Sequence, residues 1–327
     1  MNPPRLPDRI TRRLRLPLVA APMFKVSGVD LVVAACRNGV IGAFPTVNAR
    51  STVLLDQWLG EIGARLFAAP EEAAPVCPNL IMRSPRMADD LACLVKHRVE
   101  LVITSVGSPA PAVAALHDIG CLVLADVATL AHARKAIAAG ADGLVLLTAG
   151  AGGQTGWLNP LAFVRALRVE YDGPLVLAGG ISDGVALRAA QVLGCDLACM
   201  GTRFIASRES LAAQAYRDLL VQADLDDVLL TRAFTGLPTN MLVASITRAG
   251  LDPQRLDEQV SPASAAQMFG GGTQRDQADA AGGDAPDGPR RWRDIWSAGH
   301  SVSGVRAVQS VDALVAQVEQ EYHHAGG

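Results

Sequence analysis

A run of small residues carries one amide side chain at a point where a chemist would look for an acid or a base. The segment AGAGGQTG covers residues 149–156, and Ala151, Gly152 and Gly153 leave no bulk beside Gln154. A primary amide donates and accepts hydrogen bonds, but it does not exchange a proton near neutral pH. We therefore expect Gln154 to hold a substrate or cofactor by hydrogen bonds rather than to act as a base.

Ionisable candidates for the same chemistry are few. Lys25 follows an apolar run and is a candidate for binding an anionic substrate. Asp126 is either a solvated residue or a polar group of a pocket that replaces a missing base. His300, in SAGHSVSGV, is either a plain turn residue or an imidazole of the active site. The remaining histidines of helical segments are expected at the surface: His97, His117 and His132.

Two glycine-rich segments could hold a phosphate. LAGGISDG contains Gly179 and Gly180, and MGTRF contains Gly201 and Thr202. Glycine lets backbone N–H groups approach a phosphate closely, and the threonine hydroxyl adds a donor. Each segment alone could equally be a simple turn from a strand into a helix.

These residues follow short apolar segments that read as strands. Eight such segments occur, at 17–23, 40–45, 76–82, 100–107, 121–128, 143–150, 174–181 and 197–205. Segments with apolar residues at every third or fourth position lie between them and predict helices at 28–39, 51–66, 111–120, 129–140, 159–171 and 184–194. Five glycines stand at expected helix ends: Gly39, Gly120, Gly140, Gly173 and Gly194.

Strands that are apolar throughout and alternate with helices indicate a parallel sheet buried on both faces, and eight units predict an α/β fold of the (β/α)₈ TIM-barrel type. The alternative is an open doubly wound sheet, which would normally carry a glycine-rich turn after its first strand. That position reads APMFKVSGVD, with a single glycine, so the barrel is favoured.

In a barrel, functional groups lie at the carboxyl ends of strands, and the loops after strands seven and eight often bind phosphate. Both glycine-rich segments fall in those two loops, which favours a phosphorylated cofactor or substrate. The first strand ends in Ala21, Pro22 and Met23, where a rigid backbone and a flexible thioether could lie against a flat ring. Asn79 stands at the end of the third strand.

The pattern changes after the eighth strand. We expect a single domain over 1–327, with the barrel over about 14–222 and a C-terminal helical and loop extension over about 223–327. Residues 208–230 read as helical, 231–253 as irregular, and 310–325 as an amphipathic helix. Residues 263–290 are rich in Gly, Ala, Asp and Gln and predict a mobile loop, either a linker or a lid.

Composition narrows the function classes. Hydrophobic residues make up 50% of the 327 residues, and the formal net charge is −3, so no basic field for nucleic acid or an anionic membrane surface is expected. No signal peptide or membrane span is expected. We therefore expect a cytoplasmic location. The six cysteines lie mostly in apolar runs without C-x-x-C spacing, which predicts reduced, buried side chains and no metal site.

Several motifs in the same order resemble the nitronate monooxygenase family, formerly called 2-nitropropane dioxygenases, which includes FMN-dependent enoyl-ACP reductases. They are PLVAAPM, GVIGAFP, AGADGLVLLTAGAGGQTG, PLVLAGGISDG, MGTRFIAS and IWSAGHSVSGV. The resemblance implies an FMN-binding barrel. Carried over to this chain, the phosphate would lie at Gly179, Gly180, Gly201 and Thr202, and the ring and ribityl side would be lined by Ala21, Pro22, Met23 and Asn79.

The chain departs from the family pattern at Gln154, which stands where relatives have a catalytic His. Asp126 stands where some relatives have a Lys, and His300 where relatives often have a Gln. The loss of an imidazole at 154 weighs against removing a proton from a neutral nitroalkane, but less against oxidising a preformed nitronate.

The resemblance therefore favours an FMN-dependent oxidoreductase that oxidises alkyl nitronates with O₂. One alternative is a flavin-dependent reductase or dehydrogenase of an enoyl or CoA-linked substrate, and another is an FMN-binding protein without the family's catalysis. Expected partners are a small-molecule substrate with O₂ or NAD(P)H. A monomer and a homodimer both stay open.

Overall fold

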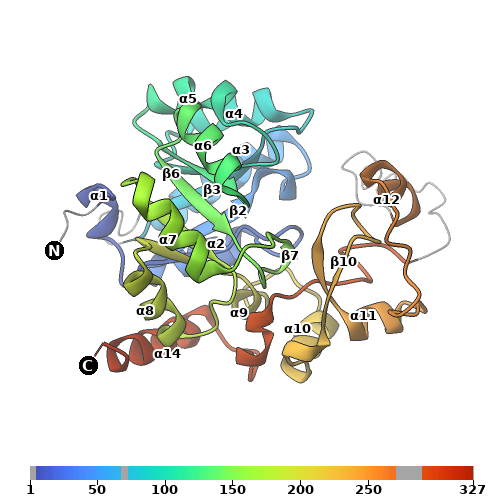
Figure 1. Cartoon of the computed structure of the whole chain (residues 1–327). Coiled ribbons are helices and arrows are strands. Elements are labelled where there is room, and N and C mark those ends of the chain that lie inside the picture. Colours follow the sequence, from blue (N-terminus) through green and yellow to red (C-terminus); the bar gives the residue numbers. More distant parts are fainter. Residues whose placement is uncertain (1–4, 68–72, 270–288, 327) are drawn as a thin grey trace.

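The fold is described from a computed structural model, which covers residues 5–67, 73–269 and 289–326. Its centre is a closed barrel of eight parallel strands, in which each strand pairs with the next and the last pairs with the first (Figure 1). The barrel strands are β1 Leu18–Ala20, β2 Ile41–Pro45, β3 Val76–Ile81, β4 Leu101–Ser105, β5 Leu122–Val127, β6 Gly143–Leu147, β8 Leu175–Ala178 and β9 Leu197–Met200. The expected TIM barrel is confirmed.

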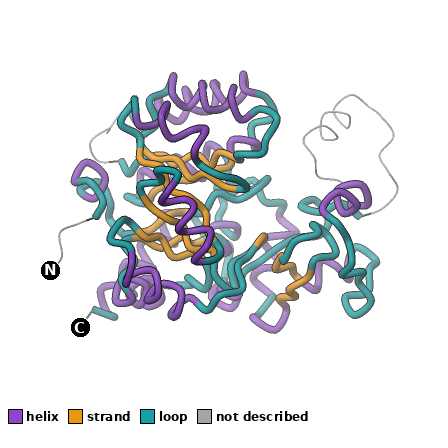
Figure 2. Tube along the Cα trace, turned by 45° about the horizontal axis from the view of Figure 1, so that its top comes forward, coloured by secondary structure: helices purple, strands orange, loops and turns teal. Residues whose placement is uncertain are grey.

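Helices follow the strands and cover the outside of the barrel (Figure 2). They are α2 Val29–Arg37, α3 Thr52–Leu66, α4 Met87–Lys96, α5 Ala110–His117, α6 Leu130–Ala138, α7 Pro160–Glu170 and α8 Gly184–Leu193. Side chains at the first position cap several of them: Ser51, Thr129, Asn159 and Asp183 each accept a backbone N–H. Helix α4 is absent from the sequence-based prediction.

Four of the five glycines expected at helix ends have a left-handed backbone: Gly39, Gly120, Gly140 and Gly194. Gly173 does not, so that prediction is wrong. Helix α7 ends at Glu170, Tyr171 is extended, and Tyr171 packs so closely that a Cβ on Gly173 would lie 2.1 Å from its hydroxyl.

The inside of the barrel is filled by alternate strand residues such as Val19, Ile41, Leu124 and Val176. Their neighbours along the strands point outward and pack under the helices. The short helix α1, Asp8–Thr11, places the buried Ile10 against the inner cluster, at the end of the barrel where the strands begin. The carboxyl ends of the strands stay open for a site.

The eighth helix of the ring comes from late in the sequence. After β9 only the short helix α9, Thr202–Ile205, follows directly. Helix α14, Val311–His324, packs against α8 and α2 and so fills the eighth position (Figure 1). We call residues 206–310 the insertion. The amphipathic helix expected at 310–325 is confirmed, although it belongs to the helical ring.

The described part of the insertion contains more regular structure than its sequence suggests. Its elements are α10 Gln214–Gln222, the 3₁₀ turn Leu225–Asp227, β10 Val228–Thr231, β11 Thr239–Leu242, α11 Val243–Arg248, α12 Pro262–Phe269 and the 3₁₀ turn His300–Gly304. Strands β10 and β11 form a small antiparallel sheet with β7, Gly153–Gln154. Of the helical stretch expected over 208–230, residues 214–222 form α10, whereas 228–230 belong to a strand. The irregular structure expected over 231–253 is wrong, because β11 and α11 lie there. Of the loop expected over 263–290, residues 263–269 are helical and 270–288 lie outside the described residues.

All six cysteines are buried and none forms a disulfide, as expected. Among the described residues, no helix has the length and apolar character needed to cross a membrane.

Candidate active site

A large cavity of about 1260 Å³ opens at the carboxyl ends of the barrel strands. It brings together all but one of the residues singled out from the sequence. These are Ala21, Pro22, Met23, Lys25, Asn79, Asp126, Ala151, Gly152, Gly153, Gln154, Gly179, Gly180, Gly201 and Thr202. The exception is His300, which is exposed and is not part of the lining. Its ring packs on the backbone of Gly150, and its backbone N–H donates to the Gly150 carbonyl (2.9 Å).

The loop after β1 is held in shape by Asn48. Its amide donates to the carbonyls of Met23 (2.9 Å) and Ser27 (2.8 Å), and its oxygen accepts the N–H of Lys25 (2.9 Å). Lys25 has a positive φ of 58°. Positive φ in a residue other than glycine is uncommon and costs free energy. The surrounding bonds thus hold Lys25 at the cavity in a strained conformation.

Strained residues concentrate around this cavity. Of the four described non-glycine residues with positive φ, three line it: Lys25, Val106 and Trp292. The fourth, Arg98, does not. Val106 is β-branched, for which such a φ is a marked outlier. Strain of this kind clusters at binding and catalytic sites, which supports a functional role for the cavity.

The turn that carries Gln154 is fixed by the insertion. Gly153 and Gln154 pair with Asn240 and Thr239 of β11, and the buried Asn240 amide donates to the Ala151 carbonyl (2.7 Å). The side chain of Gln154 is exposed at the cavity, and its amide forms no hydrogen bond to any described residue. Its backbone is therefore anchored while its amide is available for a ligand.

The two glycine-rich loops leave backbone donors available. The N–H groups of Gly180, Gly201 and Thr202 have no protein acceptor among the described residues. A Cβ on Gly179 would lie 2.5 Å from the Thr148 hydroxyl, so only glycine fits there. The buried Thr202 hydroxyl accepts the Gly299 N–H (3.0 Å) and keeps its own proton for another acceptor. This donor set fits a phosphate, and we call the two glycine-rich loops that carry it the phosphate cradle.

Arg203, which the sequence analysis did not single out, positions that cradle. Its side chain is buried, and it donates to the Ser182 carbonyl (2.8 Å) and to Gln317 of α14 (3.2 Å). The first bond ties the loop after β8 to the segment after β9. Burial lowers the pKa of this guanidinium from its usual value.

Asp126, at the end of β5, is the single acid in the lining. Asp126 is half-buried, and burial raises the pKa of its carboxyl to about 7. No described cation pairs with it. A carboxyl with this pKa can hold or release a proton near neutral pH, as a general acid or base must.

Asn79 lies on the floor of the cavity and is 5% exposed. It donates to the Ile103 carbonyl (3.2 Å) and to the Ser105 hydroxyl (3.0 Å), which ties the ends of β3 and β4 together. These bonds fix the orientation of the amide.

The insertion adds an aromatic wall that the sequence analysis missed. Tyr216 stacks on Trp296 with ring centroids 5.0 Å apart, and its hydroxyl donates to the Ser297 carbonyl. Trp292 meets Phe24 edge to face, 6.5 Å away. All four rings belong to the cavity lining. No spacing in the sequence indicates that these residues come together.

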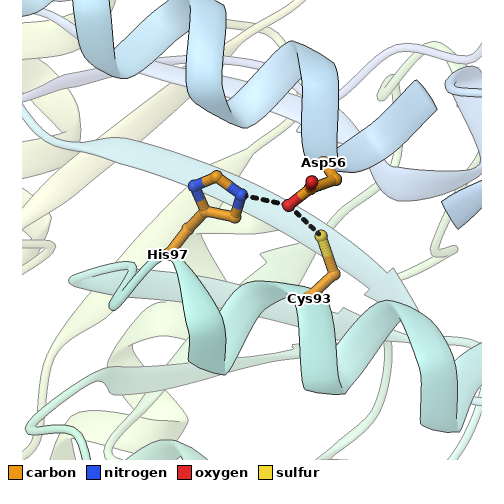
Figure 3. A group of neighbouring side chains, drawn as sticks. All are labelled: Asp56, Cys93 and His97. Atoms are coloured by element: carbon orange, nitrogen blue, oxygen red, sulfur yellow. Dashed lines mark hydrogen bonds and ion pairs between the residues drawn. The ribbon is translucent and has the colours of Figure 1, made fainter. Parts of the chain in front are cut away.

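A second cluster of reactive side chains lies outside the cavity, between α3 and α4 (Figure 3). The Asp56 carboxylate lies 2.7 Å from both the His97 ring and the Lys96 ammonium, and 3.9 Å from the Cys93 sulfur. Carboxylate, imidazole and thiolate are zinc ligands. Here, however, Lys96 occupies the carboxylate oxygen, and burial next to Asp56 raises the pKa of Cys93 to about 11. The cluster therefore acts as a charged link between two helices, and His97 is half-buried rather than a plain surface residue.

The closed barrel with one large cavity, a phosphate cradle and an anchored turn defines the class: a (β/α)₈ barrel with a site at the carboxyl ends of its strands. The family model for nitronate monooxygenase matches residues 10–321, so the chain belongs to the nitronate monooxygenase family. The family and its structural neighbours are oxidoreductases.

Individual relatives differ in what they do. The chain is 27% identical over 349 residues to a nitronate monooxygenase of Paraburkholderia phytofirmans, covering 93% of this chain and 92% of that protein. It is 28% identical over 232 residues to a Mycobacterium tuberculosis (3aS,4S,5R,7aS)-5-hydroxy-7a-methyl-1-oxo-octahydro-1H-indene-4-carboxyl-CoA dehydrogenase, covering 69% of this chain but only 62% of that protein.

Solved structures share the fold. FabK from Thermotoga maritima aligns with a TM-score of 0.78 at 23% identity, over 98% of this chain and 97% of that one. A nitroalkane oxidase from Streptomyces ansochromogenes aligns with a TM-score of 0.78 at 24% identity, over 98% and 99% of the two chains.

Proposed function

We propose that the protein is an FMN-dependent oxidoreductase that oxidises alkyl nitronates with O₂. The observation that carries this proposal is the neutral, anchored Gln154 at the cavity, where an amide binds an anion without having to remove a proton. A nitronate has already lost its carbon-bound proton, so it suits such a site.

In this proposal the FMN phosphate binds the N–H groups of Gly180, Gly201 and Thr202. Met23, Asn79 and the small residues 151–153 would line the isoalloxazine ring and ribityl chain. Bound FMN supplies the capacity to accept an electron pair from a substrate and to pass electrons on. The protein supplies orientation: Gln154 donates to the substrate's anionic oxygens, and Lys25 adds a positive charge nearby.

A second candidate is a flavin-dependent dehydrogenase or reductase of an enoyl or CoA-linked substrate. The observation that favours it is Asp126, the one acid among the described lining residues. Asp126, with its pKa of about 7, could then exchange the proton that Gln154 cannot.

Oxygen consumption separates the two candidates. Purified yellow protein should consume O₂ with ethylnitronate or propionate 3-nitronate in the absence of nicotinamide. Anaerobic bleaching of the flavin by NADH or NADPH, without a reaction with nitronates, would favour the second candidate. If neither nitronates nor a panel of enoyl thioesters changes the flavin spectrum, the chain binds FMN without the family's catalysis.

The variant Gln154→His tests the position of the amide. It should gain activity on neutral nitroalkanes, because an imidazole can remove their proton. His300→Gln is the matched control: His300 lies outside the cavity lining, so its loss should leave nitronate oxidation unchanged and should add no activity on neutral nitroalkanes. An unaltered flavin reaction in Gln154→His would contradict the placement of Gln154 over the substrate.

A further inference from the structure

The cavity lining is strongly unbalanced in charge. Four cationic side chains and one histidine contribute to it, against Asp126 as the one acid among the described lining residues, in a protein whose net charge is −3. The five are Lys25, Arg83, His132, Lys135 and Arg293. A concave surface lined by one sign of charge attracts ligands of the opposite sign. The cavity is therefore expected to attract an anionic ligand, although the protein as a whole is negatively charged.

Three of these bases lie on the side of the mouth formed by β3, β4 and β5. Arg83 follows β3, and His132 and Lys135 lie one turn apart on α6, after β5. Residues three apart share one face of a helix, and here that face also presents Ala136 to the cavity. Arg83, His132 and Lys135 thus form one basic cluster, which we call the β3–β5 rim.

The β3–β5 rim is distinct from the phosphate cradle. In the closed order of eight strands, β4 is the fourth and β9 the eighth, so they lie on opposite sides of the barrel. The cradle uses the loops after β8 and β9. A cofactor phosphate in that cradle therefore leaves the β3–β5 rim for a different anionic group.

The bases of this rim are not used to hold the protein together. No carboxylate among the described residues pairs with Arg83 or Lys135. Neighbouring cations behave differently: Arg134, on another face of α6, pairs with Glu170 at 3.1 Å, and Arg86 pairs with Asp90 at 3.1 Å. Exposed cations left unpaired around one concavity are suited to a ligand's phosphate.

We propose that the β3–β5 rim binds the phosphate-bearing tail of a long substrate, whose reacting end enters the cavity toward Gln154. This rests on the second candidate function above, a flavin-dependent dehydrogenase or reductase, and specifies the class of molecule that the site admits. The shared chemistry is a phosphorylated adenosine tail, which occurs both in CoA thioesters and in NADPH. Apolar residues such as Ile81 and Val106 line the same cavity.

Calorimetric titration of the holoprotein with CoA, NADPH and inorganic phosphate tests the proposal. CoA or NADPH should bind more tightly than phosphate, and Arg83→Ala and Lys135→Ala should each weaken that binding about tenfold, as expected for a lost charge-assisted hydrogen bond. Arg134→Ala removes the same charge from the same helix outside the cavity and should bind like the wild type. Binding of CoA alone identifies a thioester substrate, and binding of NADPH alone identifies a nicotinamide donor.

The proposal is overturned if neither nucleotide binds, if Arg83→Ala and Lys135→Ala bind like the wild type, or if Arg134→Ala weakens binding equally. Flavin absorbance and nitronate turnover are measured on the same samples. A yellow, nitronate-oxidising protein without rim-dependent binding contradicts this inference alone. A protein that binds CoA through the rim but holds no FMN contradicts the proposed function alone.

Discussion

Asp126 offers a direct test of the electrostatics of the site, through the variant Asp126→Asn. Burial raises the pKa of this carboxyl from 3.8 to about 7 in the folded chain. Between these values the folded state keeps the proton and the unfolded state releases it. Asp126 therefore makes the protein less stable as the pH rises from about 4 to about 7, and the penalty is constant above that range.

The size of the effect follows from the shift. About three pKa units at 1.36 kcal/mol each give an upper limit of about 4 kcal/mol at pH 8. At pH 5 only the first part of the range has been crossed, and the limit is about 1.5 kcal/mol. Water in the cavity solvates the carboxylate and reduces both figures. Asparagine keeps the shape without the charge, so Asp126→Asn should be stabilised more at pH 8 than at pH 5.

Urea denaturation of flavin-free wild type and Asp126→Asn at both pH values measures this difference. Flavin is removed because a ligand that binds only the folded state adds its own stabilisation. The matched control is Asp118→Asn, whose side chain is exposed and lies outside the cavity lining. An equal stability change at pH 5 and pH 8, or a loss of stability at pH 8, would refute the reasoning.

Substitutions at Asn240, Thr202 and Gly156 test the scaffold of the site, with Thr202→Ser and Gly63→Ala as controls. Asn240→Ala should lower the free energy of unfolding by about 1–3 kcal/mol and reduce kcat, because the Ala151 carbonyl loses its buried donor; urea denaturation and turnover check this. Thr202→Ala should retain less FMN than Thr202→Ser, which keeps a hydroxyl for the Gly299 N–H, as flavin absorbance of the purified proteins will report. Gly156→Ala should fail to fold stably, because its Cβ would lie 1.9 Å from the Leu147 carbonyl oxygen. Gly63→Ala, with open space around its Cβ, should be neutral or stabilised by about 0.5–1 kcal/mol in a thermal melt.

The barrel could be predicted because each of its units carries a local signal. Apolar strands, helical periodicity and glycine helix ends repeat along the chain. Their number, together with the lack of a glycine-rich turn after the first strand, favours a closed sheet over an open one. Helix α4 also has a visible apolar spacing, at Met87, Leu91 and Leu94, so it could have been found. Strand β7 could not, because two residues have no period and Gly153 and Gln154 become a strand only by pairing with β11.

The residues of the candidate site also fall into those with a local sequence signal and those without one. Residues at strand ends were predicted to meet, and the cavity lining contains them, because the barrel rule fixes where strand ends lie. The aromatic wall from Tyr216 to Trp296 depends on how the insertion folds back, for which the sequence has no local marker. His300 was drawn to the site by its motif, but its loop packs on Gly150 from outside the lining.

The position of α14 bears on how the chain is made. Its buried face, with Leu314 and Val318, covers apolar surface between α8 and α2. A ribosome must synthesise the whole insertion before it reaches this helix. Until then, the apolar surface between α8 and α2 in the nascent barrel stays exposed to solvent. Slow translation or early termination before Val311 would prolong that exposed stage. Cellular yield should therefore depend on chaperone supply during synthesis, even though the ring of helices around the barrel is complete in the finished molecule.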